Sequence, residues 1–241
     1  MTSSETRPAG QAFRFTRPVP YPAAALAMDQ LVDARWRQAI PDTVLFLEHA
    51  PVITLGNRGR DNYLLRTPEA LAREGVTVAH ATRGGDVTFH GPGQLVVYPI
   101  VALQPGEADA HRYLEKLEEA AIRVCGDFGV PAFRVAGKTG AWTDRGKIAA
   151  IGVRFKRWIA SHGMSFNVTV DLRYTDWIVP CGLVGLPVTS LQAHHPGGGC
   201  PGMAEVQERM RIRLEKTLNR RLPWADPPLP EPLQALAPFA A

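Results

Sequence analysis

The chain has 241 residues, of which 45% are hydrophobic and 21% are charged, a composition typical of a soluble globular protein rather than a disordered or fibrous one. It contains no run of about 18 apolar residues, and its first residues lack the apolar core of a signal peptide, so we expect a cytoplasmic protein without a membrane span. The 27 basic and 23 acidic side chains give a net charge of +4 without a dense basic block. This balance favours acidic partners and leaves nucleic acid and acidic proteins as equal alternatives.

The first half of the chain is predicted to alternate between strand and helix. Residues 1–20 are polar and punctuated by proline, and we expect them to be only partly ordered. Apolar residues such as Leu26, Leu31 and Trp36 recur at helical spacing and predict a helix over residues 22–40, with Pro22 in its first turn. Strands are predicted at 43–49, 51–56 and 76–79, with a short helix from Thr67. The apolar run 95–101 is typical of a strand buried on both faces, and 109–128 has helical periodicity.

The second half is predicted to consist mainly of short strands. They occupy 132–135, 140–142, 147–155 and 164–170, and a turn over 158–163 joins the last two. A helix over 204–219 precedes a proline-rich tail, for which the sequence indicates no role. Since the β-rich stretches are segregated, we predict an α+β fold, with mixed β-sheets packed by helices on one side. The expected organisation is a flexible segment (1–20), a single catalytic domain (21–222) and the tail (223–241).

A glycine-rich segment, RGGDVTFHGPGQLVVYPI from Arg83 to Ile100, organises the chain. Its four glycines allow the backbone to approach a ligand closely, so we expect a shaped surface rather than a linker. The segment has neither the GxGxxG nor the GxxxxGK[ST] spacing, and it therefore supports no dinucleotide-binding or Walker-type phosphate loop.

Three cysteines are odd in number and form no CxxC pair, which argues against a disulfide framework or a structural zinc site. Cys181 lies in a Pro-Cys-Gly sequence. A tight turn of this kind can present a nucleophile beside a backbone N–H that stabilises an oxyanion, although a buried structural cysteine is the commoner case. Cys125 lies in a helical pattern and is expected to be structural, and Cys200 is expected to be exposed and incidental.

A nucleophilic cysteine needs a base or a cation beside it, because its ordinary pKa of about 8.5 leaves little thiolate at neutral pH. The histidine candidates are His90, His162 and the adjacent pair His194 and His195. Lys147, at the start of an apolar strand, is an alternative, since buried lysines can act as bases. The residues alone leave this choice open. The histidines form no HxH or HxxxH pair, so we expect no metal site.

Four motifs together resemble the lipoyl(octanoyl) transferase family in order and spacing: RGGDVTFHGPGQLVVYPI, GKIAAIGVR, SHGMSFNV, and IVPCG followed by VTSL. The resemblance covers about residues 22–192 and implies a catalytic domain like that of biotin- and lipoate-protein ligases. It implies transfer of an octanoyl group from octanoyl-acyl carrier protein to a lysine of lipoyl domains, in 2-oxoacid dehydrogenase E2 subunits or the glycine cleavage H protein. This is the first step of endogenous protein lipoylation. We further expect a monomer that needs no cofactor and binds neither nucleic acid nor a membrane.

The resemblance also implies roles for individual residues. Cys181 matches the nucleophile that carries the acyl thioester, and Lys147 matches the lysine that activates it, which favours lysine over histidine as the base. Backbone N–H groups near Gly182, with a contribution from the His90 loop, would hold the oxyanion. Ser165 stands where the family commonly has alanine, which could make the pocket more polar. The residues expected to contact the acyl chain are Arg83, Gly84, Gly85, Asp86, Val87, Thr88, Phe89, His90, Ala150, Ile151, Gly152, Gly163, Met164 and Ser165.

Two other functions compete with this interpretation. An ATP-dependent lipoate- or biotin-protein ligase would use a similar loop and lysine to hold an acyl-adenylate, but it would need no cysteine. The Pro-Cys-Gly sequence, and the lack of Gly-Gly-Gly in the loop, distinguish the two. A non-catalytic acyl-binding scaffold would not need to retain both Cys181 and Lys147.

Overall fold

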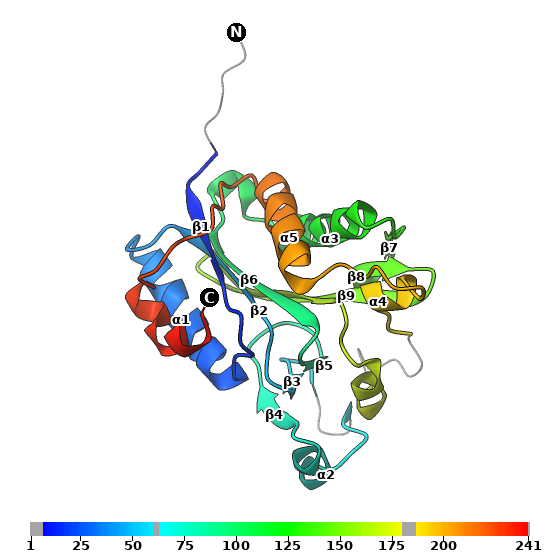
Figure 1. The fold of residues 1–241 in the computed structure, drawn as a ribbon. Coiled ribbons are helices and arrows are strands. Elements are labelled where there is room, and N and C mark those ends of the chain that lie inside the picture. Colours follow the sequence, from blue (N-terminus) through cyan, green and yellow to red (C-terminus); the bar gives the residue numbers. More distant parts are fainter. Residues whose placement is uncertain (1–6, 60–62, 180–186, 241) are drawn as a thin grey trace.

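The computed structural model describes residues 7–59, 63–179 and 187–240, and Cys181 lies outside these ranges. Within them, a seven-stranded sheet and a three-stranded sheet are packed with helices (Figure 1). The larger sheet has the order β1–β2–β6–β10–β9–β8–β7, with β1 (Gly10–Arg14), β2 (Asp42–Leu47), β6 (Gln94–Ala102), β7 (Phe133–Val135), β8 (Lys138–Thr143), β9 (Gly146–Lys156) and β10 (Ile159–Asn167). The smaller sheet has the order β4–β3–β5, with β3 (Val52–Leu55), β4 (Thr77–His80) and β5 (Val87–His90). The helices are α1 (Tyr21–Trp36), α2 (Pro68–Arg73), α3 (Ala110–Asp127), α4 (Leu191–His194) and α5 (Met203–Thr217), with 3-10 helices η2 (Pro105–Glu107), η3 (Leu172–Trp177) and η5 (Glu231–Phe239).

Strand β6 lies in the interior of the larger sheet and is buried along almost its whole length, as its apolar run predicted. It pairs antiparallel with β2 on one side and with β10 on the other. Because successive side chains point to opposite faces, Leu95 and Val97 enter one core while Val96 and Tyr98 enter the other.

Helices cover both faces of the larger sheet. Helices α3 and α5 pack on one face, and α1 with η5 packs on the other (Figure 1). The prediction of mixed sheets packed by helices is confirmed, but the prediction that the helices lie on one side is wrong. The reason is that a central strand with apolar residues on both faces needs cover on both.

Helix α1 begins with Pro22 in its first turn, as expected, but it ends at Trp36 rather than near residue 40. The expectation that Leu26 and Trp36 belong to its apolar stripe is wrong, because they are 56% and 51% exposed. Small residues such as Ala24 and Ala27, together with Leu31, form the packed face instead.

Strands β9 and β10 form a tight hairpin, and the turn predicted over 158–163 is misplaced. Arg157 and Trp158 make the turn, both with positive φ, as a two-residue hairpin of this kind requires. His162 and Gly163 lie inside β10, opposite Val153 and Gly152. A Cβ at residue 163 would lie 2.6 Å from Cδ of Pro99 on β6, so the glycine permits close strand packing rather than a turn.

Both terminal segments pack against the rest of the chain. Strand β1 pairs parallel with β2, and its Ala12 N–H donates to the Pro223 carbonyl oxygen (2.9 Å). In η5, Leu233 and Leu236 are fully buried in the core that contains α1. The polar and proline-rich composition of these segments did not predict such contacts.

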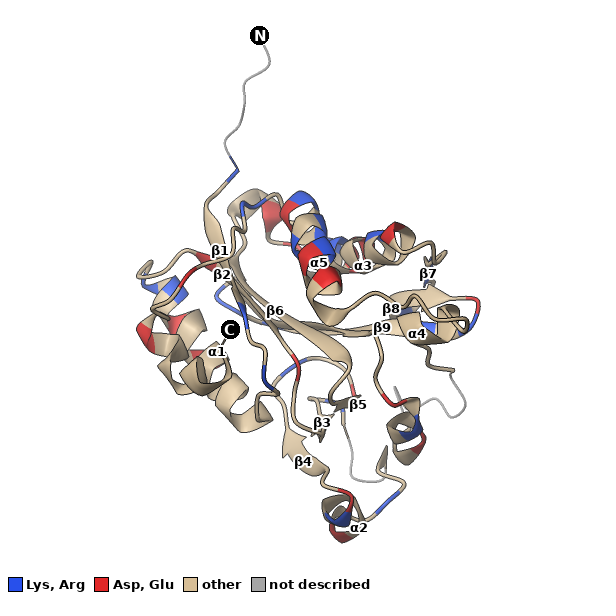
Figure 2. Ribbon diagram, viewed as in Figure 1, with Lys and Arg blue, Asp and Glu red and all other residues tan. Residues whose placement is uncertain are grey.

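The smaller sheet lies beside the larger one and has its own core, which includes Ile53, Val87 and Phe89. Its strand β5 occupies the middle of the glycine-rich segment, so that segment is two turns around a strand rather than one continuous loop. Figure 2 shows basic and acidic residues interleaved along α3 and α5. In the described part of the chain, no helix has the length and apolarity needed to cross a bilayer.

Candidate functional site

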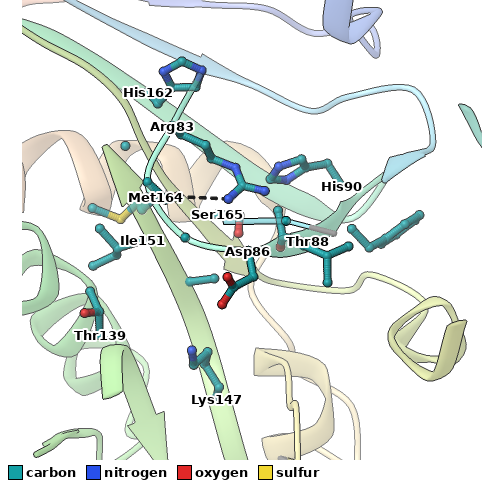
Figure 3. A pocket seen from close by; sticks show the side chains of 18 of the residues that line it. Arg83, Asp86, Thr88, His90, Thr139, Lys147, Ile151, His162, Met164 and Ser165 are labelled. Carbon is teal, nitrogen blue, oxygen red and sulfur yellow. Dashed lines mark hydrogen bonds between the residues drawn. The ribbon is translucent and has the colours of Figure 1, made fainter. Parts of the chain in front are cut away.

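A cavity of about 1100 Å³ lies between strands β9 and β10 of the larger sheet, the turn at residues 83–86, and strand β5 (Figure 3). Its wall contains Lys147 and every residue predicted to contact an acyl chain. The fourteen residues predicted to contact an acyl chain come from three separate stretches of sequence: Arg83 to His90, Ala150 to Gly152, and Gly163 to Ser165.

The turn at residues 83–86 forms one wall and is fixed over β9 by its backbone. Gly84 N–H donates to the Val153 carbonyl oxygen (2.9 Å), and a Cβ on Gly152 would lie 2.8 Å from the Gly84 carbonyl oxygen. The Arg83 guanidinium donates to both the carbonyl (2.8 Å) and the hydroxyl oxygen (2.7 Å) of Thr54. Glycine is therefore needed at residue 152, because the backbone of β9 and the backbone of the turn at 83–86 meet there at contact distance.

His90, at the end of β5, is held in a buried polar chain. Its Nδ1–H donates to Oε1 of Gln94 (2.7 Å), whose amide nitrogen donates to Oδ1 of Asn167 (3.0 Å). Burial, followed by the neighbouring His49 and Arg83, holds the pKa of His90 well below its ordinary value. The ring is therefore neutral and committed to structure at Nδ1, which does not favour it as the base that activates a thiol.

Lys147 lies at the opposite end of the cavity from His162 (Figure 3). Its backbone N–H donates to the Pro187 carbonyl oxygen (2.9 Å), and its carbonyl oxygen accepts from Thr189 N–H (3.0 Å). Ile178 and Val188, which precede and follow Cys181 in the chain, both line the cavity. Cys181 and Gly182, predicted as nucleophile and oxyanion donor, lie outside the described residues.

The other candidate bases and nucleophiles do not line this cavity. His194 lies within hydrogen-bond distance of the Thr143 hydroxyl (3.0 Å), and His195 Nδ1 lies 2.8 Å from the Leu191 carbonyl oxygen, which hold both side chains at α4. Cys125 is buried in α3, where burial raises its pKa to about 12. Cys200 is half-buried against the main core rather than exposed, and burial raises its pKa too.

Several wall residues were not predicted, among them Tyr21, Gln94, Tyr98 and Asn167. The signal that could have found the last three is a polar group within or at the end of a buried strand, because such a group is kept only where it has a partner or a ligand. Among residues 7–59, 63–179 and 187–240, no three His, Cys, Asp or Glu side chains are grouped so that they could hold a metal ion.

Comparison with known proteins gives consistent matches. Residues 21–214 match the family described as the lipoyl protein ligase A/B catalytic domain. A curated octanoyltransferase of Pelobacter propionicus is 45% identical, over 86% of this chain and 95% of that protein. A second curated octanoyltransferase, of Koribacter versatilis, is 43% identical over 91% of this chain and 91% of that protein. Among solved structures, a bipartite lipoate protein ligase of Thermoplasma acidophilum has a TM-score of 0.74 over 95% of this chain and 91% of that one. At 15% identity, this last likeness concerns the fold alone.

Proposed function

This chain belongs to the lipoyl protein ligase A/B catalytic domain family, and we propose that it transfers an octanoyl group from octanoyl-acyl carrier protein to a lysine of lipoyl domains through a thioester on Cys181. The expected family and enzyme class, an acyltransferase, are confirmed by the curated octanoyltransferases that match most of its length. The residue roles and the individual partners are our proposal.

One observation carries the proposed site. A single cavity is lined by Lys147, by all fourteen residues expected to contact the acyl chain, and by Ile178 and Val188 on either side of Cys181 in the sequence. The Lys147 backbone also pairs with Val188. A cavity that reaches the point where residues 187–189 pair with β9 suits a reaction in which the acyl group is attached to Cys181, six residues earlier in the sequence.

The chemistry has two transfers. Lys147 accepts the proton of the Cys181 thiol, and the thiolate attacks the thioester carbonyl of octanoyl-acyl carrier protein. The carrier leaves as its thiol after taking the proton back, and the octanoyl group stays on Cys181. The amine of the acceptor lysine then attacks this thioester and forms an amide, while its proton passes through Lys147 to the cysteine. Because a thioester is converted to an amide, the reaction needs no ATP.

The acceptors that we propose are lipoyl domains of 2-oxoacid dehydrogenase E2 subunits and the glycine cleavage H protein, met by a monomeric enzyme in the cytoplasm. The modest positive charge of the chain favours encounter with acidic partners. The competing function is an ATP-dependent ligase, which would activate a free acid as an adenylate and form no enzyme thioester.

The test is the intact mass of the protein after mixing with octanoyl-acyl carrier protein without ATP. We expect an octanoyl adduct that hydroxylamine removes, that transfers to a lipoyl domain, and that is absent in Cys181→Ser. Cys200→Ser is the matched control and should retain the adduct, because Cys200 does not line the cavity. No adduct, together with acceptor modification only from octanoic acid and ATP, would overturn the transferase in favour of a ligase.

A further inference from the structure

His162 occupies the inner end of the cavity, away from Lys147 (Figure 3). The side chain is 5% exposed, and its Nδ1 atom has no hydrogen-bond partner in the described part of the chain. Burial, followed by Arg83 and Arg154, lowers the pKa of His162 to about 4, so the ring is neutral at neutral pH. A buried imidazole nitrogen without a partner is uncommon and indicates a ligand or a bound water.

The other polar rings at this end are already engaged. His49 donates from Nδ1 to the Val19 carbonyl oxygen (2.7 Å), so its Nε2 accepts from the Tyr98 hydroxyl (2.7 Å). His90 Nδ1 donates to Gln94. His162 therefore supplies a hydrogen-bonding group that its neighbours do not saturate.

An octanoyl chain that starts beside Lys147 does not reach His162. His162 pairs with Val153, six residues beyond Lys147 on β9, so the two backbone positions are separated by about 20 Å of strand at about 3.3 Å per residue. The lysine side chain, with five bonds of about 1.5 Å each, covers at most about 7 Å of this separation and leaves about 13 Å to the end at His162. The seven carbon–carbon bonds of an octanoyl group, at about 1.5 Å each, span at most about 10 Å. The cavity therefore continues beyond the methyl end of the chain into a polar region.

We propose that His162 forms a polar subsite at the inner end of the cavity, which binds an oxygen: a water when the octanoyl group is in place, or a hydroxyl at the end of a longer acyl chain. This inference rests on the proposed function, because it takes the acyl chain to start beside Lys147. A cavity of about 1100 Å³ with polar groups in its wall has room for a water at this end. A longer apolar chain displaces that water and leaves the imidazole unsatisfied, so the subsite makes His162 a determinant of chain length.

The experiment compares two ten-carbon donors, decanoyl-acyl carrier protein and 10-hydroxydecanoyl-acyl carrier protein. We expect the wild-type protein to transfer the hydroxylated chain with a kcat/KM about tenfold higher, the effect of roughly one buried hydrogen bond. In His162→Phe, which keeps a ring of similar size without nitrogen, the two donors should become equal or reverse. In His162→Asn, which keeps a polar group and tolerates the positive φ of 56°, the preference should persist.

Equal rates for the two donors in the wild-type protein would overturn the subsite, whether or not the Phe variant folds. A preference that persists undiminished in a His162→Phe protein still able to transfer octanoyl groups would also overturn it. Octanoyl transfer by the wild-type protein separates the two proposals. If that transfer is absent, both fail; if it is present while the ten-carbon donors react equally, the subsite alone fails.

Discussion

Lys147 and Trp142 lie opposite each other across the β8–β9 ladder, and Nζ of Lys147 is 4.8 Å from the centroid of the Trp142 ring. The ring is 5% exposed, and its Nε1–H donates to the Lys138 carbonyl oxygen (3.0 Å), which fixes its orientation. The face of an indole attracts a cation. In the proposed mechanism, the ring therefore stabilises the ammonium that Lys147 becomes when it accepts the Cys181 proton.

Trp142→Leu is expected to slow acylation of the enzyme by octanoyl-acyl carrier protein about tenfold. A desolvated cation–π contact contributes about 1–2 kcal/mol, and 1.36 kcal/mol corresponds to a factor of ten in rate. Trp142→Phe keeps an aromatic face and should retain more of the rate. Quenched-flow mass spectrometry measures the step, and Trp158→Leu, which removes a half-exposed tryptophan outside this cavity, is the control. A Trp142→Leu protein that is acylated at the wild-type rate would contradict the positioning role.

Gly146→Ala is expected to disturb the contact between Lys147 and the segment after Cys181. Gly146 has φ +127°, and a Cβ there would lie 2.6 Å from the carbonyl carbon of Pro187, whose oxygen accepts from Lys147 N–H. We expect about 1–3 kcal/mol of lost stability from strain and overpacking, and at least a tenfold loss of transfer activity. Thermal unfolding and transfer assays measure the two effects.

The matched control for Gly146→Ala is Gly126→Ala in α3, where the added methyl group meets open space. Alanine favours a helix over glycine by about 1 kcal/mol, so this variant should be slightly more stable and equally active. Full transfer activity in Gly146→Ala would show that residues 187–189 tolerate displacement from β9.

The glycine-rich segment and the central strand could be predicted because their signals are local: clustered glycines in one, and a continuous apolar run in the other. The choice of base could not be predicted in the same way. From residues alone, Lys147 competed with four histidines, and their distances from the cavity depend on tertiary structure: His194 and His195 are held at α4, whereas Lys147 and His162 lie at opposite ends of the cavity. Gly163 was misread for a related reason. Its need for close approach to Pro99 depends on a strand about 60 residues away in the chain.

His49 is expected to make the stability of the fold depend on pH. Its burial lowers the pKa to about 4 from an ordinary value of 6.5. The unfolded chain thus binds a proton near pH 6.5, whereas the folded protein does not until about pH 4. The contribution of His49 to the free energy of unfolding is therefore complete above pH 6.5. It falls by about 3 kcal/mol as the pH drops toward 4.

Urea unfolding at several values between pH 7 and pH 4 measures this dependence. His49→Gln, which still offers a donor and an acceptor but does not titrate, should be less stable at pH 7 and should lose about 3 kcal/mol less than wild type over that range. His111→Gln is the control, because His111 is exposed on α3. Parallel pH profiles for His49→Gln and wild type would contradict the assignment.

The tail after Pro223 is expected to stabilise the domain, although its composition suggested no role. Leu233 and Leu236 are fully buried in the core shared with α1, and Pro223 and Ala12 connect the tail to β1. Leu233→Ala removes three carbons from that core and should lower the free energy of unfolding by about 2–5 kcal/mol. Ala235→Ser, at an exposed position of the same helix, should change it by less than about 0.5 kcal/mol. Chemical denaturation measures both variants. This core lies on the face of the sheet opposite α3 and α5. If Leu233→Ala loses no more stability than Ala235→Ser, η5 is dispensable for the fold.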